Sequence, residues 1–272
     1  MRLWLRDPLA ILAEGAARGL VVEDGRIAEL VPAGGAPAAP VEATFDASGH
    51  VVLPGLVNAH HHFYQTLTRA HPRAMDSELF AWLTALYPLW ARLTEEDLRL
   101  AARVALVELL MSGCTCAADH HYLYPAGLER AVDVEVEEAR ALGVRLVVTR
   151  GSMDLSRKDG GLPPDEVVQG RDEILADCER VLRLFHDPAP GAMARVALAP
   201  CSPFSASRGL MEDAAALAAR ADCRLHTHLA ETADEDEWCR RAYGLRPLDL
   251  LDDVGWLTDR TWLAHGVHFD DG

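Results

Sequence analysis

Histidines occur in closely spaced pairs within apolar segments of this chain. The first pair is His60 and His62, and the second is His226 and His228. Side chains two residues apart lie on the same face of a β-strand. Neutral imidazole is a ligand that zinc and iron favour, and a catalytic metal takes about three protein ligands with one open position. The first pair therefore predicts half of a metal site, whereas His226 lies deeper in its strand and is as readily a packed or supporting residue.

An acidic residue and a further histidine extend this set. Glu231 follows His228 by three residues, so it would stand at the strand mouth, within reach of metal-bound water or substrate. A proton shuttle requires that position. His265 ends another apolar run and is a candidate to polarise the substrate, with a capping or loop histidine as the alternative. A packed core histidine is the ordinary reading of any one of these residues, but two pairs on separate strands favour a metal site.

The composition is that of a soluble globular protein without affinity for nucleic acid. The 272 residues are 50% hydrophobic and 25% charged, an ordinary balance. A net charge of -16 repels phosphate backbones and favours a small neutral substrate. No signal peptide and no apolar run of about 18 residues is present in the sequence, so we expect no membrane span and a cytoplasmic location. The six cysteines contain no CxxC pair, which favours free thiols, with metal ligation by Cys114 and Cys116 as the alternative.

The elements that must position these residues fall into two groups. Residues 1–56 predict a small β domain, with a hairpin turn at Asp24-Gly25. Residues 57–272 alternate strands and helices, which is typical of βα units on a parallel sheet. The predicted strands are 19–23, 26–31, 43–53, 56–60, 116–120, 144–150, 195–199, 224–229 and 261–265. The predicted helices are 95–111, 128–142, 171–185, 209–221 and 234–243.

Local signals support two of these assignments. Thr94, with Asp97 three residues later, resembles a capping box at the start of the helix at 95–111, and Gly113 ends it. The segment 152–169 contains glycines and prolines and is long for a loop in a compact barrel. Such a loop is usually functional or disordered.

Polar residues follow several of the predicted strands. His120, His121 and Arg150 lie at the carboxyl ends of the second and third parallel strands, as His60 does on the first. A (β/α) barrel builds its active site at that rim. A doubly wound sheet places ligands at the same ends, so the rim alone does not separate the two folds.

The motifs together resemble the amidohydrolase superfamily, in its branch of aromatic-ring deaminases and chlorohydrolases. They are the run 54–62, His228-Leu229-Ala230-Glu231 and Ala264-His265, in this order along the whole chain. The resemblance implies an α/β fold, a TIM-type (β/α)₈ barrel with a small β domain. It also implies one divalent metal, zinc or alternatively iron. The implied ligands are His60, His62 and His228, with Glu231 as proton shuttle and His265 orienting the attacked group.

Three further stretches resemble the 8-oxoguanine deaminases, and hydroxyatrazine hydrolases share parts of them. They are 60–70, 119–125 and 150–153 with 158–164. The implied reaction is hydrolytic deamination of a purine-like ring, 8-oxoguanine to urate and ammonia, with a triazine hydrolase as the alternative. Candidate residues for ring recognition are Gln65, His120, His121, Tyr122 and Arg150. Arg150 could instead pair with an acid, and Gln65 could simply begin the following helix.

The sequence departs from the family at its end. Family members carry an aspartate after barrel strand eight that binds the metal and acts as general base. This sequence ends after the sixth predicted parallel strand, and Asp270 and Asp271 belong to the loop after that strand. We therefore expect a fragment of a longer protein, with a catalytically dead metal- or purine-binding fragment as the alternative function. The expected partner is a small molecule, with no nucleic acid and no membrane, and a homo-oligomer is left open.

Overall fold

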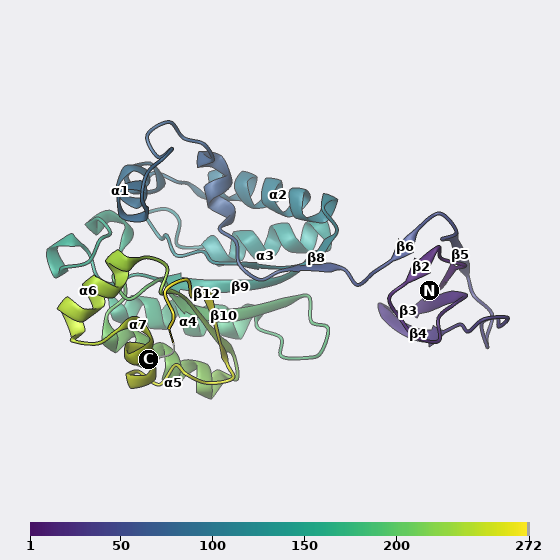
Figure 1. Cartoon of the computed structure of the whole chain (residues 1–272). Helices are drawn as coiled ribbons and strands as arrows, with labels where there is room; N and C mark the ends of the chain where they lie inside the picture. Colours follow the sequence, from purple (N-terminus) through teal and green to yellow (C-terminus); the bar gives the residue numbers. More distant parts are fainter. Residues whose placement is uncertain (271–272) are drawn as a thin grey trace. The chain divides into compact units, whose positions relative to one another are not determined.

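The computed structural model describes residues 1–270, which divide into two compact units. The first unit is Met1–Gly55, and the second begins at Leu56. Most elements of each unit can be followed by label in Figure 1.

The first unit consists of short β-strands. A four-stranded sheet has the order β4-β3-β1-β5, and β2 pairs with β6 in a second small sheet. Between β3 and β4, Asp24 and Gly25 have φ values of 48° and 76°. Two successive residues with positive φ are what a two-residue hairpin turn needs, so the predicted hairpin is confirmed. The strands are β1 (Arg2–Arg6), β2 (Ala10–Ile11), β3 (Gly19–Glu23), β4 (Arg26–Leu30), β5 (Ala43–Asp46) and β6 (Val51–Val52).

The single strand predicted at 43–53 is wrong, because this segment forms two strands in two different sheets. A turn separates β5 from β6, in which the Ser48 N–H donates to Asp46 Oδ1 at 3.0 Å and the His50 N–H donates to the Ala47 carbonyl at 2.8 Å. Strand β1 is absent from the predicted strands. All five of its residues are partly exposed, so the alternation that marks a half-buried strand is missing.

The second unit is built on a curled sheet of six parallel strands. Their order in the sheet is β12-β11-β10-β9-β8-β7, which is the order along the chain. The predicted α/β architecture with six strands of a (β/α) barrel is confirmed. The strands are β7 (Leu56–Asn58), β8 (Cys114–Asp119), β9 (Arg145–Ser152), β10 (Ala194–Pro200), β11 (Arg224–Leu229) and β12 (Thr261–His265).

Helices connect these strands, and the five predicted helices are all present. They are α2 (Glu95–Met111), α3 (Ala131–Leu142), α4 (Arg171–Phe185), α5 (Arg208–Ala221) and α6 (Ala233–Tyr243). The structure adds α1 (Leu79–Trp90), α7 (Pro247–Asp253) and the 3₁₀ helices η1 (Phe63–Thr68), η2 (Arg157–Asp159) and η3 (Asp165–Val167). The last two lie in the segment 152–169. Among residues 1–270, no helix is both long and apolar enough to cross a membrane.

Helix α1 is difficult to predict because its sequence has no clear amphipathic period. It is apolar on nearly all sides and contains Pro88, and its N-cap Glu78 makes no capping hydrogen bond through its side chain. These features remove the periodicity and the boundary signals on which sequence prediction of a helix depends.

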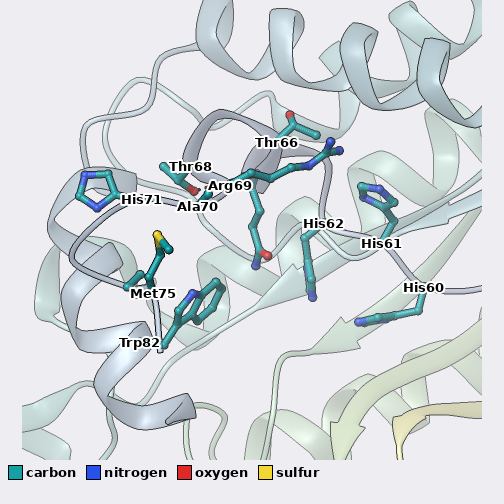
Figure 2. Close-up of a pocket in the computed structure, with 12 residues that line it drawn as sticks. His60, His61, His62, Thr66, Thr68, Arg69, Ala70, His71, Met75 and Trp82 are labelled. Carbon is teal, nitrogen blue, oxygen red and sulfur yellow. Dashed lines mark hydrogen bonds between the residues drawn. The ribbon is translucent and has the colours of Figure 1, made fainter. Parts of the chain in front are cut away.

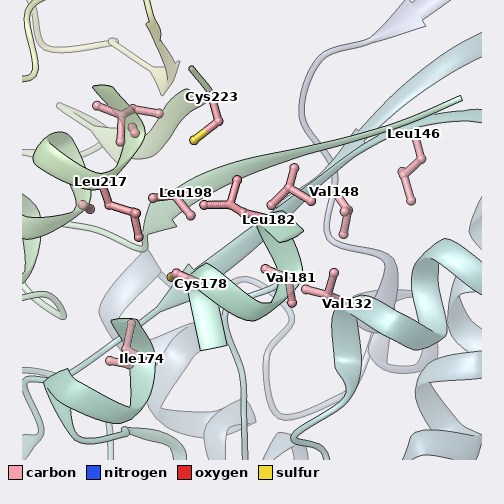
Figure 3. Close-up of a cluster of buried hydrophobic side chains, with 14 of the residues drawn as sticks. Val132, Leu146, Val148, Ile174, Cys178, Val181, Leu182, Leu198, Leu217 and Cys223 are labelled. Atoms are coloured by element: carbon pink, nitrogen blue, oxygen red, sulfur yellow. The ribbon is translucent and has the colours of Figure 1, made fainter. Parts of the chain in front are cut away.

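The core of the second unit lies between the sheet and its helices. Figure 3 shows Leu146, Val148 and Leu198 of the strands facing Val181 and Leu217 of the helices. All of these side chains are buried. This packing fixes the helices against one face of the sheet and leaves the carboxyl ends of the strands to carry polar residues.

All six cysteines are free thiols, and five of them are buried. Cys114 and Cys116 lie at the start of β8. They are therefore at the opposite end of this strand from His120, which follows its last residue.

Removing the cap of α2 should destabilise the fold. The Thr94 side chain accepts from the Asp97 N–H, and the Asp97 carboxylate accepts from the Thr94 N–H, which confirms the capping box. Thr94→Ala should lower the free energy of unfolding by about 1 kcal/mol, measured in urea. The matched control is Thr84→Ala, because the exposed Thr84 hydroxyl only donates to the Phe80 carbonyl inside α1. Its effect should stay within a few tenths of a kcal/mol, and equal effects of the two variants would contradict the capping role.

Candidate metal centre

The three predicted metal ligands lie together at the carboxyl end of the sheet. His62 Nε2 is 3.1 Å from His228 Nε2. One ligand atom from each of His60, His62 and His228 lies within 4.8 Å of the others. His228 belongs to β11, whereas His60 and His62 lie beyond the end of β7.

The predicted strand at 56–60 is too long, since β7 ends at Asn58. Strand β7 is at the edge of the sheet, and its pairing with β8 is irregular between Leu56 and Val57. The chain nevertheless stays extended at His62, with φ −133° and ψ 92°. Figure 2 shows the His62 ring and the His61 ring pointing in opposite directions. The alternation that the sequence analysis assigned to a strand is therefore retained without ladder pairing.

Hydrogen bonds to backbone carbonyls determine which nitrogen of two ligands carries hydrogen. His62 Nδ1 is 2.7 Å from the His120 carbonyl, and His228 Nδ1 is 2.7 Å from the Cys201 carbonyl. A carbonyl only accepts, so both Nδ1 atoms donate and both Nε2 atoms present lone pairs. Two lone pairs 3.1 Å apart repel each other unless a cation lies between them. The arrangement therefore fits a metal ion.

His226 orients the third ligand. His226 Nδ1 is 2.8 Å from the Trp262 carbonyl, so this nitrogen donates and His226 Nε2 accepts. His60 Nδ1 lies 2.8 Å from that Nε2 and must be the donor. His60 Nε2, which is buried without a hydrogen-bond partner, then carries a lone pair. His226 thus has the supporting role that the sequence analysis left open, as is common for metal-ligating histidines.

A second set of three imidazoles is His60, His120 and His226, whose ligand atoms also lie within 4.8 Å of one another. We favour the first set because the contact between His60 and His226 is an ordinary N–H···N hydrogen bond that needs no cation. His120 is fully buried and stacks on His228, with ring centroids 4.4 Å apart at an angle of 9°. His120 therefore packs against the ring of His228 and supports it.

Burial keeps the ligand imidazoles neutral. It lowers the pKa of His60 to about 3, and it holds the pKa of His62 and His228 well below the usual value, with neighbouring imidazoles adding to the effect. Because a metal binds the neutral ring, these histidines are in the ligating form at neutral pH.

Glu231 stands beside the ligands because the chain turns sharply after β11. Ala230 has a φ of 52°, and the Glu235 carboxylate accepts from the N–H groups of Ala230 and Glu231, each at 2.9 Å. Glu231 Oε2 lies 3.4 Å from His265 Nε2 at the end of β12. Burial raises the pKa of Glu231 to about 7. A carboxyl with that pKa can both take and give a proton at neutral pH.

Two neighbouring cavities adjoin these residues. Their volumes are about 530 and 260 Å³, and both are lined by His60, His62, Gln65 and Trp82. The smaller cavity is also lined by residues of α1 and of four other strand ends. The residues at the strand ends include Tyr122, Phe204, His228, Glu231 and His265. Figure 2 shows Trp82 and Met75 on the side of the larger cavity across from His60. The histidines and Glu231 therefore open onto a space that suits a small ligand.

The predicted residues for ring recognition are only partly brought together. Gln65 and Tyr122 line the cavities, and His120 lies behind His228. His121 and Arg150 are fully buried and are not among the residues that line either cavity.

Arg150 is paired inside the protein. Its Nε donates to Asp177 Oδ2 at 2.5 Å and its Nη2 donates to Gln169 Oε1 at 2.8 Å. The guanidinium carbon is 3.6 Å from the centroid of the Tyr124 ring. Arg150 therefore forms an ion pair with an acid, which was the alternative to a role in ring recognition.

The comparisons with known proteins agree with this geometry. The amidohydrolase family model matches residues 51–272. The chain belongs to the amidohydrolase family. It is 60% identical to the 8-oxoguanine deaminase of Pseudomonas aeruginosa, over 99% of this chain and 61% of that protein. It is 36% identical to the hydroxydechloroatrazine ethylaminohydrolase of Pseudomonas sp. (strain ADP), over 92% of this chain and 54% of that protein.

A solved amidohydrolase has the same fold. The crystal structure of atrazine chlorohydrolase from Arthrobacter aurescens TC1, complexed with zinc, matches with a TM-score of 0.86 and 30% identity. The match covers 98% of this chain and 61% of that one. This amidohydrolase chain thus spans about 61% of the length of its relatives from P. aeruginosa and A. aurescens.

Some residues of this amidohydrolase site are absent from the sequence-based set. Trp82 lines both cavities, and Leu79 and Leu83 line the smaller one. All three belong to α1, which the sequence analysis does not predict. Their only signal is the dense aromatic and apolar run of that helix, which is also what a core helix looks like.

Removing one ligand should release the ion from this centre. His228→Ala deletes one of the facing Nε2 atoms and should lose the ion held there, whereas Glu231→Gln should keep it. Metal content per chain, measured by plasma mass spectrometry after gel filtration, checks this. His268→Ala is the control, because His268 is exposed. Equal loss of the ion in the His228 and Glu231 variants would contradict the assigned roles.

Proposed function

We propose that this protein catalyses the metal-dependent hydrolytic deamination of a purine-like ring, namely 8-oxoguanine to urate and ammonia. The observation that carries the proposal is the convergence of three imidazole lone pairs beside Glu231 in a cavity of small-molecule size. The 60% identity to an 8-oxoguanine deaminase supports the substrate. One water is consumed: a C–O bond forms at the ring carbon, the exocyclic C–N bond breaks and ammonia leaves.

The metal would be held by His60, His62 and His228. An all-imidazole donor set suits zinc and iron, and the zinc complex of the related chlorohydrolase supports zinc. A divalent ion bound there would supply the Lewis acidity that makes water nucleophilic near neutral pH.

Glu231 would move the proton. Its carboxylate can take a proton from the attacking water and deliver it to a ring nitrogen, which raises the electrophilicity of the neighbouring carbon. A pKa raised to about 7 by burial suits both halves of this transfer. His265, 3.4 Å from Glu231, would donate a hydrogen bond that orients the attacked group.

We assign ring recognition to Gln65, Tyr122 and Trp82. The Gln65 amide offers a donor and an acceptor to the edge of a heterocycle. The indole of Trp82 offers an apolar face to the plane of the ring. These three residues line the smaller cavity together with Glu231 and His265.

The second candidate is a triazine hydrolase that releases an alkylamine or chloride. The 36% identity to hydroxydechloroatrazine ethylaminohydrolase favours it. Both candidates use the same attack of water on an electron-poor ring carbon, so the leaving group and the recognition of the ring edge separate them.

A substrate panel on the full-length protein tests the proposal. Ammonia release from 8-oxoguanine should exceed amine or chloride release from hydroxyatrazine and atrazine by at least about 10²-fold in kcat/KM, because unpaired polar groups in the site penalise the wrong ring. Turnover of the triazines without turnover of 8-oxoguanine would overturn the substrate assignment. Ammonia release by the 272-residue chain alone would contradict the alternative of a purely binding fragment.

Neutralising Glu231 should stop turnover without emptying the site. Glu231→Gln keeps the shape but cannot accept the proton, so kcat should fall by about 10² to 10⁴-fold. Steady-state assays with 8-oxoguanine and metal analysis of the same samples measure both properties. Glu237→Gln is the matched control, because Glu237 is an exposed residue on α6. A variant at Glu231 with wild-type kcat would exclude this residue as the proton carrier.

A further inference from the structure

A second group of potential ligands lies outside the cavities described above. It consists of Asp119 at the end of β8, His121 two residues later and Glu135 on α3. Each residue is fully buried, with an exposed fraction of 0%. One ligand atom from each lies within 4.8 Å of the other two.

The imidazole of this group directs a lone pair at a carboxylate. His121 Nε2 is 2.7 Å from the Leu123 carbonyl, so Nε2 carries the hydrogen and Nδ1 carries the lone pair. His121 Nδ1 is 3.2 Å from Glu135 Oε1 and has no hydrogen-bond partner. Two acceptors thus face each other, as they do at His62 and His228.

The two carboxylates lack a positively charged partner. Asp119 Oδ1 accepts from the Phe63 N–H at 2.6 Å. Within residues 1–270, the remaining oxygens of Asp119 and Glu135 have no donor from another group, and the two carboxyls contact each other. The positive charge of Arg150 lowers the pKa of His121. The guanidinium itself is bonded to Asp177 and Gln169 and not to these two carboxylates. Buried charges in proteins are paired or bind metals, so these acceptors need a positively charged partner.

We propose that Asp119, His121 and Glu135 bind a second divalent cation, a buried zinc ion. Two carboxylates and one neutral imidazole together carry two negative charges, which a divalent cation balances. Such a balance is required in a site that excludes water. Zinc accepts this donor set, and ligands at its usual bond lengths lie about 3.3 Å apart in a tetrahedral site. The 3.2 Å between His121 Nδ1 and Glu135 Oε1 matches that spacing.

The ion would brace the loop that carries the catalytic ligands. Asp119 holds the N–H of Phe63, which directly follows His62. Between Asp119 and His121, the His120 N–H donates to the His61 carbonyl at 2.7 Å and the His120 carbonyl accepts from His62. Fixing Asp119 and His121 therefore fixes the backbone partner that sets the His62 tautomer. The residues of this second site line neither cavity, so its role is structural.

Protons are the competing occupants. Burial raises the pKa of Glu135 to about 8 and raises that of Asp119 well above its usual value. Two protons, one on each carboxyl, would also make the group neutral, with one carboxyl donating to the other and the second donating to His121 Nδ1. The experiment must distinguish an ion from two protons.

Zinc stoichiometry of the full-length protein distinguishes them. After growth with zinc and removal of loosely bound metal, the wild type should hold two ions per chain, and Glu135→Gln and His228→Ala should each hold one. The control is Glu138→Gln, one turn further along α3, where Glu138 is buried but paired with Arg99 and Arg103. This variant should hold two.

One ion in the wild type and none in His228→Ala would overturn the proposal in favour of protons, whether or not Glu135→Gln folds. X-ray absorption of His228→Ala gives a second readout. Its remaining zinc should show one imidazole with oxygen ligands, and a shell of several imidazoles would also overturn the proposal.

Discussion

The site depends on two imidazole nitrogens that face each other as acceptors. His62 Nε2 and His228 Nε2 are 3.1 Å apart, and neither donates because the Nδ1 atom of each ring is bound to a carbonyl. Leaving a buried polar atom unsatisfied costs about 1–3 kcal/mol. His60 Nε2, beside these two atoms, is buried without a hydrogen-bond partner. A metal ion bound there would resolve this conflict and would help to define the local structure as well as the chemistry.

Backbone carbonyls in or just after neighbouring strands control these tautomers. The acceptors are the carbonyls of His120 after β8, Cys201 after β10 and Trp262 within β12. Strands that run parallel bring their carboxyl ends to one edge, so carbonyls of residues far apart in sequence surround the imidazoles. The register that pairs His228 with Ala264 and Leu229 with His265 also brings Glu231 and His265 to the same rim. Secondary structure thus sets the protonation pattern of the site.

The parts of this structure that could be predicted from the sequence are those that depend on residues close together in the chain. The spacing of His60 and His62 carries the ligand geometry because alternation persists in extended chain even where β7 has ended. The cap at Thr94 and the turn at Asp24-Gly25 are likewise local. The ion pair of Arg150 with Asp177 is not, because it joins β9 to a residue of α4 that the sequence does not mark as its partner. Trp82 could not be predicted as a site residue for a related reason, because α1 is apolar on nearly all sides.

Polar groups that need a ligand differ from purely structural ones in this fold by whether their donors and acceptors have partners. Arg150 is fully buried, yet its guanidinium is bonded to Asp177 and Gln169 and stacked on Tyr124, so it needs no ligand. His226 is almost as buried and is bonded through both nitrogens, which makes it a support for His60. Within residues 1–270, potential ligand atoms cluster at two places, at the histidines of the rim and at Asp119, His121 and Glu135. Asp119 accepts from the backbone N–H next to His62, so the two groups are connected. A positive charge bound by Asp119, His121 and Glu135 would therefore stabilise the loop that carries His60 and His62.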